Sequence, residues 1–560
     1  MYRNNLFKYL ICAFAILLLF LTSYAIEEDK RLKLEDFAVD VATESGEFVY
    51  TIKWWEQEAV ESTQYYITLP YHARDKEVRA NFQCDNAVFF DGVEIENGSV
   101  LAPLQEGNHV ISCAKKIYNL YVFYGSDIPT LHIATESGSL KYLKQDRDNR
   151  ELGHISIVYQ DELIYRDVLE YIKGRGNYTW TYNKKPFNLK FLEKVDLFGM
   201  GESDKWCLLA NSMDGTMLKN KLGYEFADKV GLDFSSQAML VDVYINNEYM
   251  GNYTLSETVE VGENRVDIVD LEALNAEANA GVDIREFTQS GTRGKNSYLE
   301  YGSAKWIDIP NNPVDFTGGY LLEFELASRY DKELCGFISN YGQPVVIKSP
   351  EYASCAEVEY IRDYYQAFED AVMDETGYNA QGKHYSDYVD VTSIAKMYVY
   401  QEFIKNLDGA ATSLFFYKNP GEKIVAGPVW DVDLGFGYPV ERDGVQMDDP
   451  GTLWITGGHL SNELSDKYSV FSLLCQHEDF INEAKRQWKN CFEPNIPGLL
   501  KEVDRLYENT SASIVSDKCK WTVKGNHNVA VDKVDSAILK LKIFIKERSE
   551  FLSEHFQEDK

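Results

Sequence analysis

The chain has 560 residues, more than one hydrophobic core usually serves, so two or more domains are expected. Hydrophobic residues make up 45% and charged residues 26%, a composition typical of globular proteins that excludes general disorder. The formal net charge of -33 argues against nucleic-acid binding, which needs a basic surface, and is compatible with a basic protein substrate.

The first 25 residues have the pattern of a signal peptide. Arg3 and Lys8 form a basic start, an apolar run covers residues 9–21, and Ser23 and Ala25 are small residues at the positions a signal peptidase reads. A membrane span needs roughly 20 apolar residues, so this shorter run predicts cleavage, with an uncleaved signal anchor as the alternative. No later stretch of the sequence is long and apolar enough to span a bilayer. We therefore expect a secreted or cell-surface protein with no transmembrane span in the mature chain.

Residues 26–136 are predicted to form short strands. Stretches such as GEFVYTIKWW and NLYVFYGS are rich in aromatic and β-branched residues, and Gly, Asn and Asp separate them. This pattern predicts a small, sandwich-like all-β accessory domain. It contains no catalytic constellation, so a binding or spacer role is expected.

From residue 137 to about 356 the pattern indicates an α+β lobe. DGTMLKNKLGYEFADKVGL has apolar residues at helical spacing and a glycine at its end. MLVDVYINNEYMGNYTLSETV predicts a hairpin that turns at Asn246 and Asn247. Residues 285–312 are polar and rich in glycine, which predicts an inserted loop.

From about residue 357 to 560 helices dominate the prediction. EVEYIRDYYQAFEDAVM and VTSIAKMYVYQEFIKNL are expected to be amphipathic helices, followed by two short strands and further helices. A β-rich lobe followed by a helical lobe is the layout of a protein kinase, although layout alone is a weak reason to assign function. The predicted fold class is α+β, a two-lobed fold with the layout of a protein kinase after a small all-β domain.

Three aspartates are the strongest candidates for chemistry. Asp408 follows the second of these helices, and Asp431 and Asp433 follow the two short strands. Phosphoryl transfer needs one carboxylate to orient the attacking hydroxyl and another to hold the metal ion on the phosphates. Asp431 and Asp433 would point to one face of an extended segment, where a hard cation such as Mg²⁺ would offset their repulsion. The alternative is that Asp408 caps a turn and Asp433 binds a structural cation.

A second candidate site lies in KGRGNYTW and the strand after it. Gly174 and Gly176 flank Arg175 in a turn where backbone N–H groups can approach a phosphate, although most such turns only close a hairpin. Lys190 lies in the next strand and Glu225 in the following helix. Kinases hold a strand lysine against the phosphates with a helix glutamate. The alternative is a surface salt bridge of little energetic weight.

Cysteine usage leaves two interpretations open. No CxxC pair and no His/Cys cluster with zinc-ligand spacing occurs, so a zinc–thiolate site is not expected. An even number of cysteines in an exported protein permits disulfides, for which Cys84 with Cys113 and Cys335 with Cys355 are the near neighbours. The alternative is that several are buried thiols. The cysteines after the predicted signal peptide are Cys84, Cys113, Cys207, Cys335, Cys355, Cys475, Cys491 and Cys519.

Six ordered blocks resemble the CotH kinase family, named for spore-coat protein H. The resemblance covers roughly residues 153–551 and implies an atypical kinase fold that binds ATP with Mg²⁺ or Mn²⁺. It also implies phosphorylation of serine or threonine on a secreted or coat protein. The blocks are GRGNYTW with KKPFNLKF, KWCLLANSMDGTMLKNKLGYEFA, DVYINNEYMGNYTLSETVEVGENRVDI, GGYLLEFE, KNLDG with SLFFYKN, and GPVWDVDLGFG.

The resemblance also implies residue roles. Asp408 is the expected catalytic-loop aspartate, Asp431 the metal-binding aspartate that stands where kinases have DFG, and Asp433 its support at the metal. Ser413 stands where kinases place a further metal-binding Asn, and no HRD triplet is present, so one tightly held ion is expected. The residues that match the family's phosphate-side turn are Arg175, Gly176 and Asn177.

The lysine and the tryptophan near the nucleotide are less clearly indicated. Lys190 is the expected phosphate lysine with Glu225 as its partner, and Lys348, which ends an apolar strand, is a competing lysine. Trp430 either lines the nucleotide pocket or belongs to the core.

The predicted function is that of a secreted protein kinase that transfers the γ-phosphoryl group of ATP to Ser or Thr. The alternative is a non-catalytic cell-surface structural or binding protein on a kinase-like scaffold, and a third possibility is transfer of AMP. In a kinase the three carboxylates should line one cleft, with Asp408 and Asp431 within about 15 Å of each other and Lys190 reaching in.

Overall fold

The computed structural model describes residues 34–58, 63–114, 116–292, 303–409, 411–456, 469–523 and 525–557. The predicted signal peptide and part of the predicted loop 285–312 lie outside the described residues. The chain divides into two compact units, one of residues up to 173 with 241–252 and 509–532, the other of 174–240, 253–508 and 533–560. The boundaries inferred at residues 136 and 356 remain predictions. None of the helices in the described ranges is both long and apolar enough to cross a membrane.

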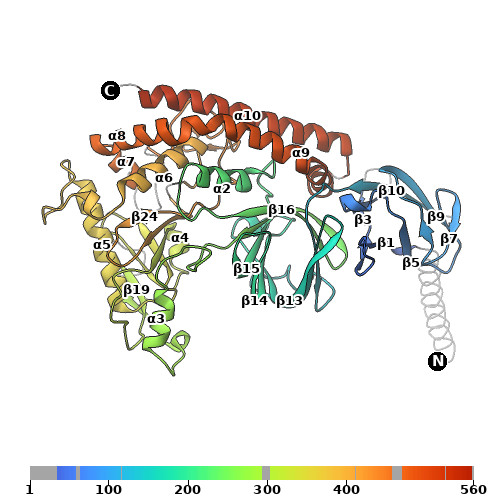
Figure 1. Ribbon diagram of the computed structural model, residues 1–560, viewed down its shortest axis with the longest axis horizontal. Coiled ribbons are helices and arrows are strands. Elements are labelled where there is room, and N and C mark those ends of the chain that lie inside the picture. The colour runs from blue at the N-terminus through green and yellow to red at the C-terminus, as the bar shows by residue number, and fades with distance from the viewer. Residues whose placement is uncertain are drawn as a thin grey trace, which may run out of the picture. The chain divides into compact units, whose positions relative to one another are not determined.

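Two sheets form most of the first unit, which confirms a sheet-rich N-terminal region. Neighbouring strands are mostly antiparallel, but β11 pairs with β16, β2 with β17, and β4 with β10, in parallel. Figure 1 shows β9 and β10 of the second sheet side by side. The first sheet has the order β13 (Glu162–Gly174), β12 (Arg150–Tyr159), β11 (Thr130–Thr135), β16 (Ala238–Ile245), β17 (Glu248–Glu257), β2 (Val49–Lys53), β1 (Glu35–Ala42), β5 (Val78–Gln83) and β8 (Val100–Leu101). The second has the order β3 (Trp55–Glu58), β4 (Thr63–Leu69), β10 (Lys116–Tyr124), β9 (Gly107–Cys113), β6 (Val88–Phe90) and β7 (Val93–Ile95).

Strand β5 forms where the sequence alternates. Along β5, VRANFQ, buried and exposed residues alternate strictly, as expected for a sheet with one face on the core. The β16–β17 hairpin turns at Asn246 and Asn247, which have φ angles of 53° and 71°. Asn tolerates this left-handed conformation, and the predicted hairpin is confirmed.

A buried carboxylate joins β16 to a helix within the first unit. Asp242 accepts hydrogen bonds from the hydroxyls of Tyr249, at 3.1 Å, and Ser513, at 2.5 Å. Burial raises the pKa of Asp242 to about 6, although these two donors favour the ionised form. Asp517 accepts from the Asn252 N–H at 3.0 Å. Polar groups buried here are thus supplied with partners from their own unit.

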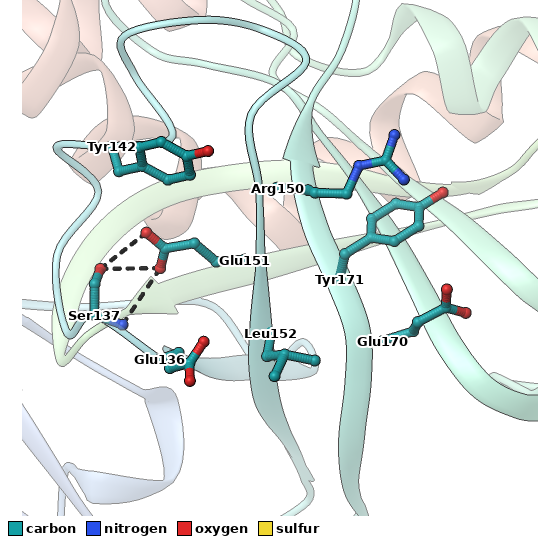
Figure 2. Close-up of a pocket in the computed structure, with 8 residues that line it drawn as sticks. All are labelled: Glu136, Ser137, Tyr142, Arg150, Glu151, Leu152, Glu170 and Tyr171. Atoms are coloured by element: carbon teal, nitrogen blue, oxygen red, sulfur yellow. Dashed lines mark hydrogen bonds between the residues drawn. The ribbon is translucent and has the colours of Figure 1, made fainter.

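The first unit also has a surface hollow of about 500 Å³ beside the β12–β13 hairpin (Figure 2). The Ser137 hydroxyl donates to the two carboxylate oxygens of Glu151 at 3.0 and 2.9 Å. The Arg150 guanidinium lies 4.9 Å from the ring centre of Tyr171. These contacts stabilise the hairpin surface, and none of the predicted site residues lines this hollow.

The second unit contains a hairpin, a sheet and most of the helices. The hairpin is β14 (Phe187–Asp196) with β15 (Glu202–Leu209), and β15 also pairs with the end of β17. The sheet is antiparallel, in the order β18 (Gln289–Thr292), β19 (Ala304–Ile307), β21 (Gly336–Ile338), β22 (Pro344–Ser349), β20 (Tyr320–Phe324), β23 (Leu414–Lys418) and β24 (Ile424–Ala426). A short ribbon of β25 (Glu441–Arg442) and β26 (Val445–Gln446) follows.

Helix α6 packs against α8 and β24 within the second unit. In Figure 1, α5 lies against β19, and α6 lies beside α8. The helices are α2 (Lys219–Lys229), α3 (Leu271–Ala278), α4 (Ala327–Tyr330), α5 (Cys355–Met373), α6 (Val391–Ile404), α7 (Val470–Leu474), α8 (Glu478–Gln487), and parts of α9 (Ile496–Trp521) and α10 (His527–Gln557). Both predicted helices around residues 357–407 are confirmed, as is α2. However, α6 is buried on nearly all sides from Ile394 onward, so the prediction that it is amphipathic was wrong: neighbours pack on every face of it.

Helix ends match local sequence signals. Ser354 and Glu357 form a reciprocal capping box at the start of α5. Asp390 caps α6 by accepting from the Ser393 N–H, and α6 ends where Lys405 adopts a left-handed φ of 50°. The eight cysteines in the described ranges are free thiols, which agrees with the buried-thiol alternative.

Candidate functional site

Asp408 lies just beyond the left-handed residue that ends α6. Its carbonyl accepts the N–H groups of Ala411 and Thr412, so the backbone forms a tight turn. Its N–H donates to the side chain of Asn406 at 3.3 Å. The side chain of Asp408 is therefore presented from a fixed turn, and it lines a cavity of about 270 Å³.

The loop after β24 brings Asp431 and Asp433 to the same cavity. Asp431 has a φ of 56°, a conformation that residues with a side chain rarely adopt. The Ser413 hydroxyl donates to its carboxylate at 3.4 Å. The three aspartates thus line one cavity, although Asp431 and Asp433 reach it from a strained loop and not from an extended segment.

Burial and mutual repulsion make these carboxylates hard to ionise. Burial first, and then the charge of Asp431, raise the pKa of Asp408 to about 6, against the opposing effect of Arg329 and Arg442. The pKa of Asp431 is also raised by burial, opposed by Arg175 and Arg329.

Asp433 is the most enclosed of the three aspartates, with 6% of its surface exposed. Burial raises its pKa well above the usual range; Asp431 and Asp214 add to this effect, and Lys219 opposes it. A cation placed between Asp431 and Asp433 would remove most of this cost, because it favours both charged forms.

The donor set fits a metal ion that is only partly held by protein. Among the residues that the structure describes, no group of three or more His, Cys, Asp or Glu side chains stands close enough to hold a metal ion. Mg²⁺ commonly takes one or two carboxylates from a protein and completes its octahedron with phosphate and water oxygens. Asp431 and Asp433 fit that pattern as the protein's share of the ligands.

The turn predicted for the phosphates lies at the same cavity. Arg175, Gly176 and Asn177 all line the cavity. Gly176 has a φ of 77°, and a Cβ there would lie 2.2 Å from Thr179 Oγ1, so the turn requires glycine. The Nε atom of Arg175 is buried and has no hydrogen-bond partner in the described part of the chain. An anion in the cavity would supply that partner.

Trp430 belongs to the cavity wall and to the core at once. Its ring stacks on Tyr224 with centroids 5.8 Å apart and planes at 11°, and the Arg175 guanidinium lies 5.4 Å from its centre. It also packs against the buried cluster that contains Val266 and Leu321. Trp430 thus packs on the core and lines the cavity, and its contact with a nucleotide stays a prediction.

The expected pair of Lys190 and Glu225 is not formed. Lys190, on β14, makes its ion pair with Asp204 on the neighbouring strand β15, and Glu225 pairs with Lys221 one turn earlier in α2 at 2.6 Å. Neither residue lines the cavity. Side chains from Leu189 to Phe191 alternate between the core and the other face, and this register places Lys190 on the non-core face.

Lys348, the competing lysine, does line the cavity. It projects from β22, and its ammonium lies 3.6 Å from Glu323 of β20 and 3.4 Å from Glu333. Burial and the neighbouring acids raise the pKa of Glu323 to about 8, although Lys348 opposes the shift. The lysine–glutamate contact of the cavity is therefore built on a sheet and not between a strand and α2.

Sequence reasoning missed the polar residues at the start of α2 and before it. Asn211 and Asn220 line the cavity, and their side chains are hydrogen bonded to each other at 3.2 Å. Lys219 is buried, which lowers its pKa against the opposing effect of Asp214 and Asp433. All three lie in the block KWCLLANSMDGTMLKNKLGYEFA, where polar residues interrupt the apolar helical pattern.

The segment after the Asp431 loop is anchored to the last helix. Glu402 of α6 accepts from the N–H groups of Trp454 and Ile455, both at 2.8 Å, and from Arg548 at 2.6 Å. Glu402 and Arg548 are both fully buried. Lys405 donates to the Thr452 hydroxyl at 2.7 Å. This network fixes the chain on the far side of the Asp408 turn.

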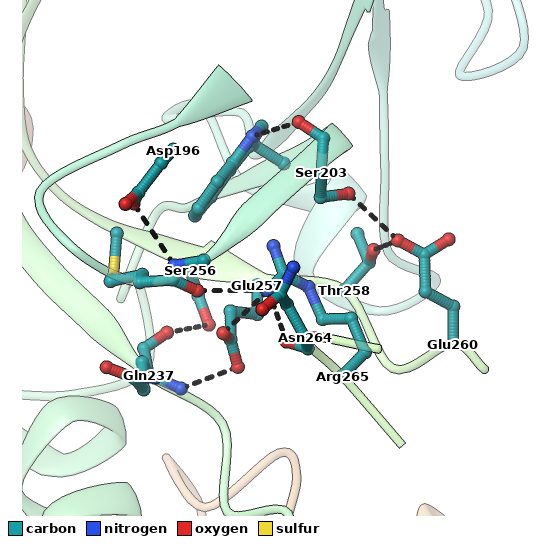
Figure 3. A network of polar contacts seen from close by, with 12 residues as sticks. Asp196, Ser203, Gln237, Ser256, Glu257, Thr258, Glu260, Asn264 and Arg265 are labelled. Carbon is teal, nitrogen blue, oxygen red and sulfur yellow. Dashed lines mark hydrogen bonds and ion pairs between the residues drawn. The ribbon is translucent and has the colours of Figure 1, made fainter. Parts of the chain in front are cut away.

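A second buried ion pair lies within another of the sequence blocks that resemble the CotH kinase family (Figure 3). Arg265 donates to Glu257 at 2.8 Å, with both side chains nearly inaccessible, and Glu257 also accepts from the Gln237 N–H at 2.9 Å. Burial raises the pKa of Glu257 to about 7, although Arg265 opposes the shift. The ETVEVGENR stretch thus contains a buried ion pair that holds the loop after β17.

Comparison with known proteins agrees with this geometry. The family described as CotH kinase protein matches residues 172–552, a range that includes Asp408, Asp431 and Asp433 and all of the cavity walls described above. No individually curated protein matches the chain. Because the match covers well over half of the sequence, this chain belongs to the CotH kinase family.

Proposed function

We propose that this protein is an exported protein kinase that transfers the γ-phosphoryl group of ATP, with Mg²⁺ or Mn²⁺, to Ser or Thr of a secreted or coat protein. The observation that carries the proposal is the convergence of Asp408, Asp431 and Asp433 on one cavity that Arg175 also lines. Acids that face each other need a cation, and Arg175 needs an anion. A metal–triphosphate complex supplies both.

In this reaction the protein's own groups orient the acceptor. The acceptor hydroxyl oxygen forms a bond to the γ-phosphorus while the bond from that phosphorus to the bridging oxygen of ADP breaks. Asp408 accepts the hydroxyl proton, and a carboxylate whose pKa is raised to about 6 is suited to receive it near neutral pH. Bound between Asp431 and Asp433, the metal ion would neutralise charge on the phosphates.

On the phosphate side we assign Arg175 and Lys348. Both line the cavity, and both carry charge opposite to that of a triphosphate. Lys348 takes the role first expected of Lys190, because Lys190 is occupied by Asp204 outside the cavity. Gly176 and Asn177 contribute turn backbone close to the same wall.

The proposal includes the architecture and location predicted from the sequence. A two-lobed kinase-like fold over residues 137–560 would follow an accessory β-domain at 26–136 and a cleaved signal peptide at 1–25. The excess of acidic residues favours a basic protein substrate. Export would place that substrate at the cell surface or in a coat.

The test is transfer of label from γ-labelled ATP, with Mn²⁺, to a library of basic Ser- and Thr-containing peptides and to the chain itself. Labelled product from wild type and none from Asp408→Asn is expected. Bound ATP with no transfer would favour the scaffold alternative, and a product heavier by AMP would replace phosphorylation with nucleotide transfer.

A further inference from the structure

Helix α2 contacts the Asp431–Gly435 loop through its first two residues. Asn220 Oδ1 accepts the Val432 N–H at 3.2 Å, and Lys219 Nζ donates to the Gly435 carbonyl at 2.8 Å. We propose that Lys219 and Asn220 are positioning residues that hold this loop so that Asp431 and Asp433 face the cavity before a cation binds. The inference rests on the proposed function, since it concerns the metal-binding loop of the same site.

The loop needs to be held because its backbone is strained at Asp431. A φ of 56° is disfavoured for a residue with a side chain, and such residues persist only where their surroundings fix them. On the side away from α2, Asn406 Nδ2 donates to the Asp431 carbonyl at 3.4 Å. Inside the loop, the Gly435 N–H donates to the Val432 carbonyl at 3.0 Å. The hydrogen bonds from α2 complete the contacts that hold this loop.

A second amide sets the orientation of Asn220. Asn211 Nδ2 donates to Thr254 Oγ1 at 2.9 Å and to the Met217 carbonyl at 3.3 Å, which leaves Asn211 Oδ1 to accept. Asn220 Nδ2 donates to that oxygen at 3.2 Å. Asn220 must therefore turn its own oxygen toward the Val432 N–H, which needs an acceptor.

The position of Lys219 is also fixed by hydrogen bonds. Asp214 accepts the Lys219 N–H at 2.9 Å, and Asp214 itself accepts from the N–H and hydroxyl of Thr216, both at 2.7 Å. From this point the Lys219 side chain reaches Gly435, two residues after Asp433, with only 5% of Lys219 exposed. The Lys219 amine is therefore held at the end of the Asp431–Gly435 loop.

Gly223 allows α2 to come this close. A Cβ at Gly223 would lie 2.6 Å from Val432 Cγ2 and 2.9 Å from the Tyr400 hydroxyl. The helix backbone therefore packs directly on the residue whose N–H Asn220 binds. Two hydrogen bonds and one close backbone contact join α2 to a single loop.

The first experiment measures Mn²⁺ binding to the full chain with a non-hydrolysable ATP analogue, by titration calorimetry. Lys219→Met and Asn220→Ala should each weaken Mn²⁺ binding about tenfold or more, as loss of supporting contacts to metal ligands commonly does. Metal-free nucleotide affinity should not change in Lys219→Met, whose residue does not line the cavity, and far-UV circular dichroism should not change in either variant. Lys229→Met, at an exposed position near the other end of α2, is the matched control and should behave as wild type. Mn²⁺ affinities within about twofold of wild type in both variants would overturn the proposal.

A second experiment needs no variant that might fail to fold. In the metal-free wild type, the Val432 amide should exchange its hydrogen slowly, because Asn220 already holds it. Exchange as fast as in an exposed loop would overturn the positioning role. This measurement is independent of the proposed function, which would instead be contradicted if wild type bound neither Mn²⁺ nor nucleotide.

Discussion

Asp242 in the first unit and Asp433 in the second are both buried aspartates, but the groups that surround their carboxylates differ. Asp242 accepts hydrogen bonds from two hydroxyls, those of Tyr249 and Ser513. Asp433 is instead surrounded by other charges: Asp431, Asp214 and Asp408 repel it, and Lys219 attracts it. A carboxylate supplied with donors stabilises the fold that encloses it. The ionised forms of carboxylates that face each other are stable only when a cation lies between them. A cluster of this kind therefore indicates a binding site and not a structural contact.

The largest difference between the two clusters should appear in catalysis. Asp408→Asn should reduce phosphate transfer by about a hundredfold to ten-thousandfold, the usual share of a positioned acid–base group. Labelled-ATP transfer measures it, with Asp228→Asn, an exposed aspartate on α2, as the control. Transfer that is undiminished in Asp408→Asn would remove this residue from the mechanism.

The free energy of unfolding should show the reverse order, with a larger loss from the Asp242 substitution than from a substitution at the candidate site. Asp242→Ala leaves two buried hydroxyls without their acceptor and should lower the free energy of unfolding by about 3 kcal/mol. Asp433→Asn removes a repulsive charge and should change it by less than about 1 kcal/mol. Urea unfolding followed by tryptophan fluorescence compares them, and equal losses in the two variants would refute the distinction.

Ligands should separate the clusters further. Mn²⁺ with ATP at 100 times the dissociation constant should raise the free energy of unfolding by about 2.7 kcal/mol, since only the folded site binds. Thermal shift should show this in wild type and in Asp408→Asn but not in Asp431→Asn. A wild type that folds yet shows no shift would favour the non-catalytic scaffold.

A pH dependence should also differ between the units. Burial lowers the pKa of His132 to about 3 and that of His72 to about 4 in the first unit. Because these values lie below the unfolded value of about 6.5, stability is full above pH 6.5 and falls as the pH drops, by about 2 kcal/mol per histidine at pH 5. The raised pKa of Asp408 acts in the opposite sense, with its stabilising contribution present in acid and lost as the pH rises through about 6.

Substitution isolates the histidine contribution. His132 stacks between Tyr50 and Tyr244, with centroids 4.3 and 4.8 Å away. His132→Gln should reduce the loss of stability between pH 6.5 and 5 by about half, measured by urea unfolding at each pH. An unchanged slope would show that the acid sensitivity comes from elsewhere.

Local signals in the sequence predicted much of the fold. The spacing of apolar residues in α2, the paired asparagines of the β16–β17 turn and the Ser354–Glu357 capping box each act over a few residues. Each can therefore be recognised without knowledge of the rest of the chain. The three aspartates were predicted to share a cavity from their order around a hairpin, and they do.

The lysine could not be predicted in the same way. Lys190 and Lys348 each lie on a strand, and only the pairing of those strands decides which one faces the cavity. Lys190 points toward Asp204 because β14 pairs with β15, whereas Lys348 shares the sheet of Glu323. Such register depends on contacts between segments far apart in sequence. The left-handed φ of Asp431 was likewise not predicted, since Asn220 and Asn406, which bond the loop there, come from other segments.

The Glu402–Arg548 pair has a consequence for the order in which the molecule becomes competent. These two residues are 146 positions apart in sequence, yet Arg548 completes the bonding of the carboxylate that anchors the chain beyond the Asp408 turn. Contacts across so long a stretch close late in folding, since the entropy of joining distant segments opposes them. A chain whose synthesis is not finished would contain the three aspartates but not the cavity that encloses them. The cavity with its three aspartates would thus be completed only after the last helix, α10, has been synthesised and packed.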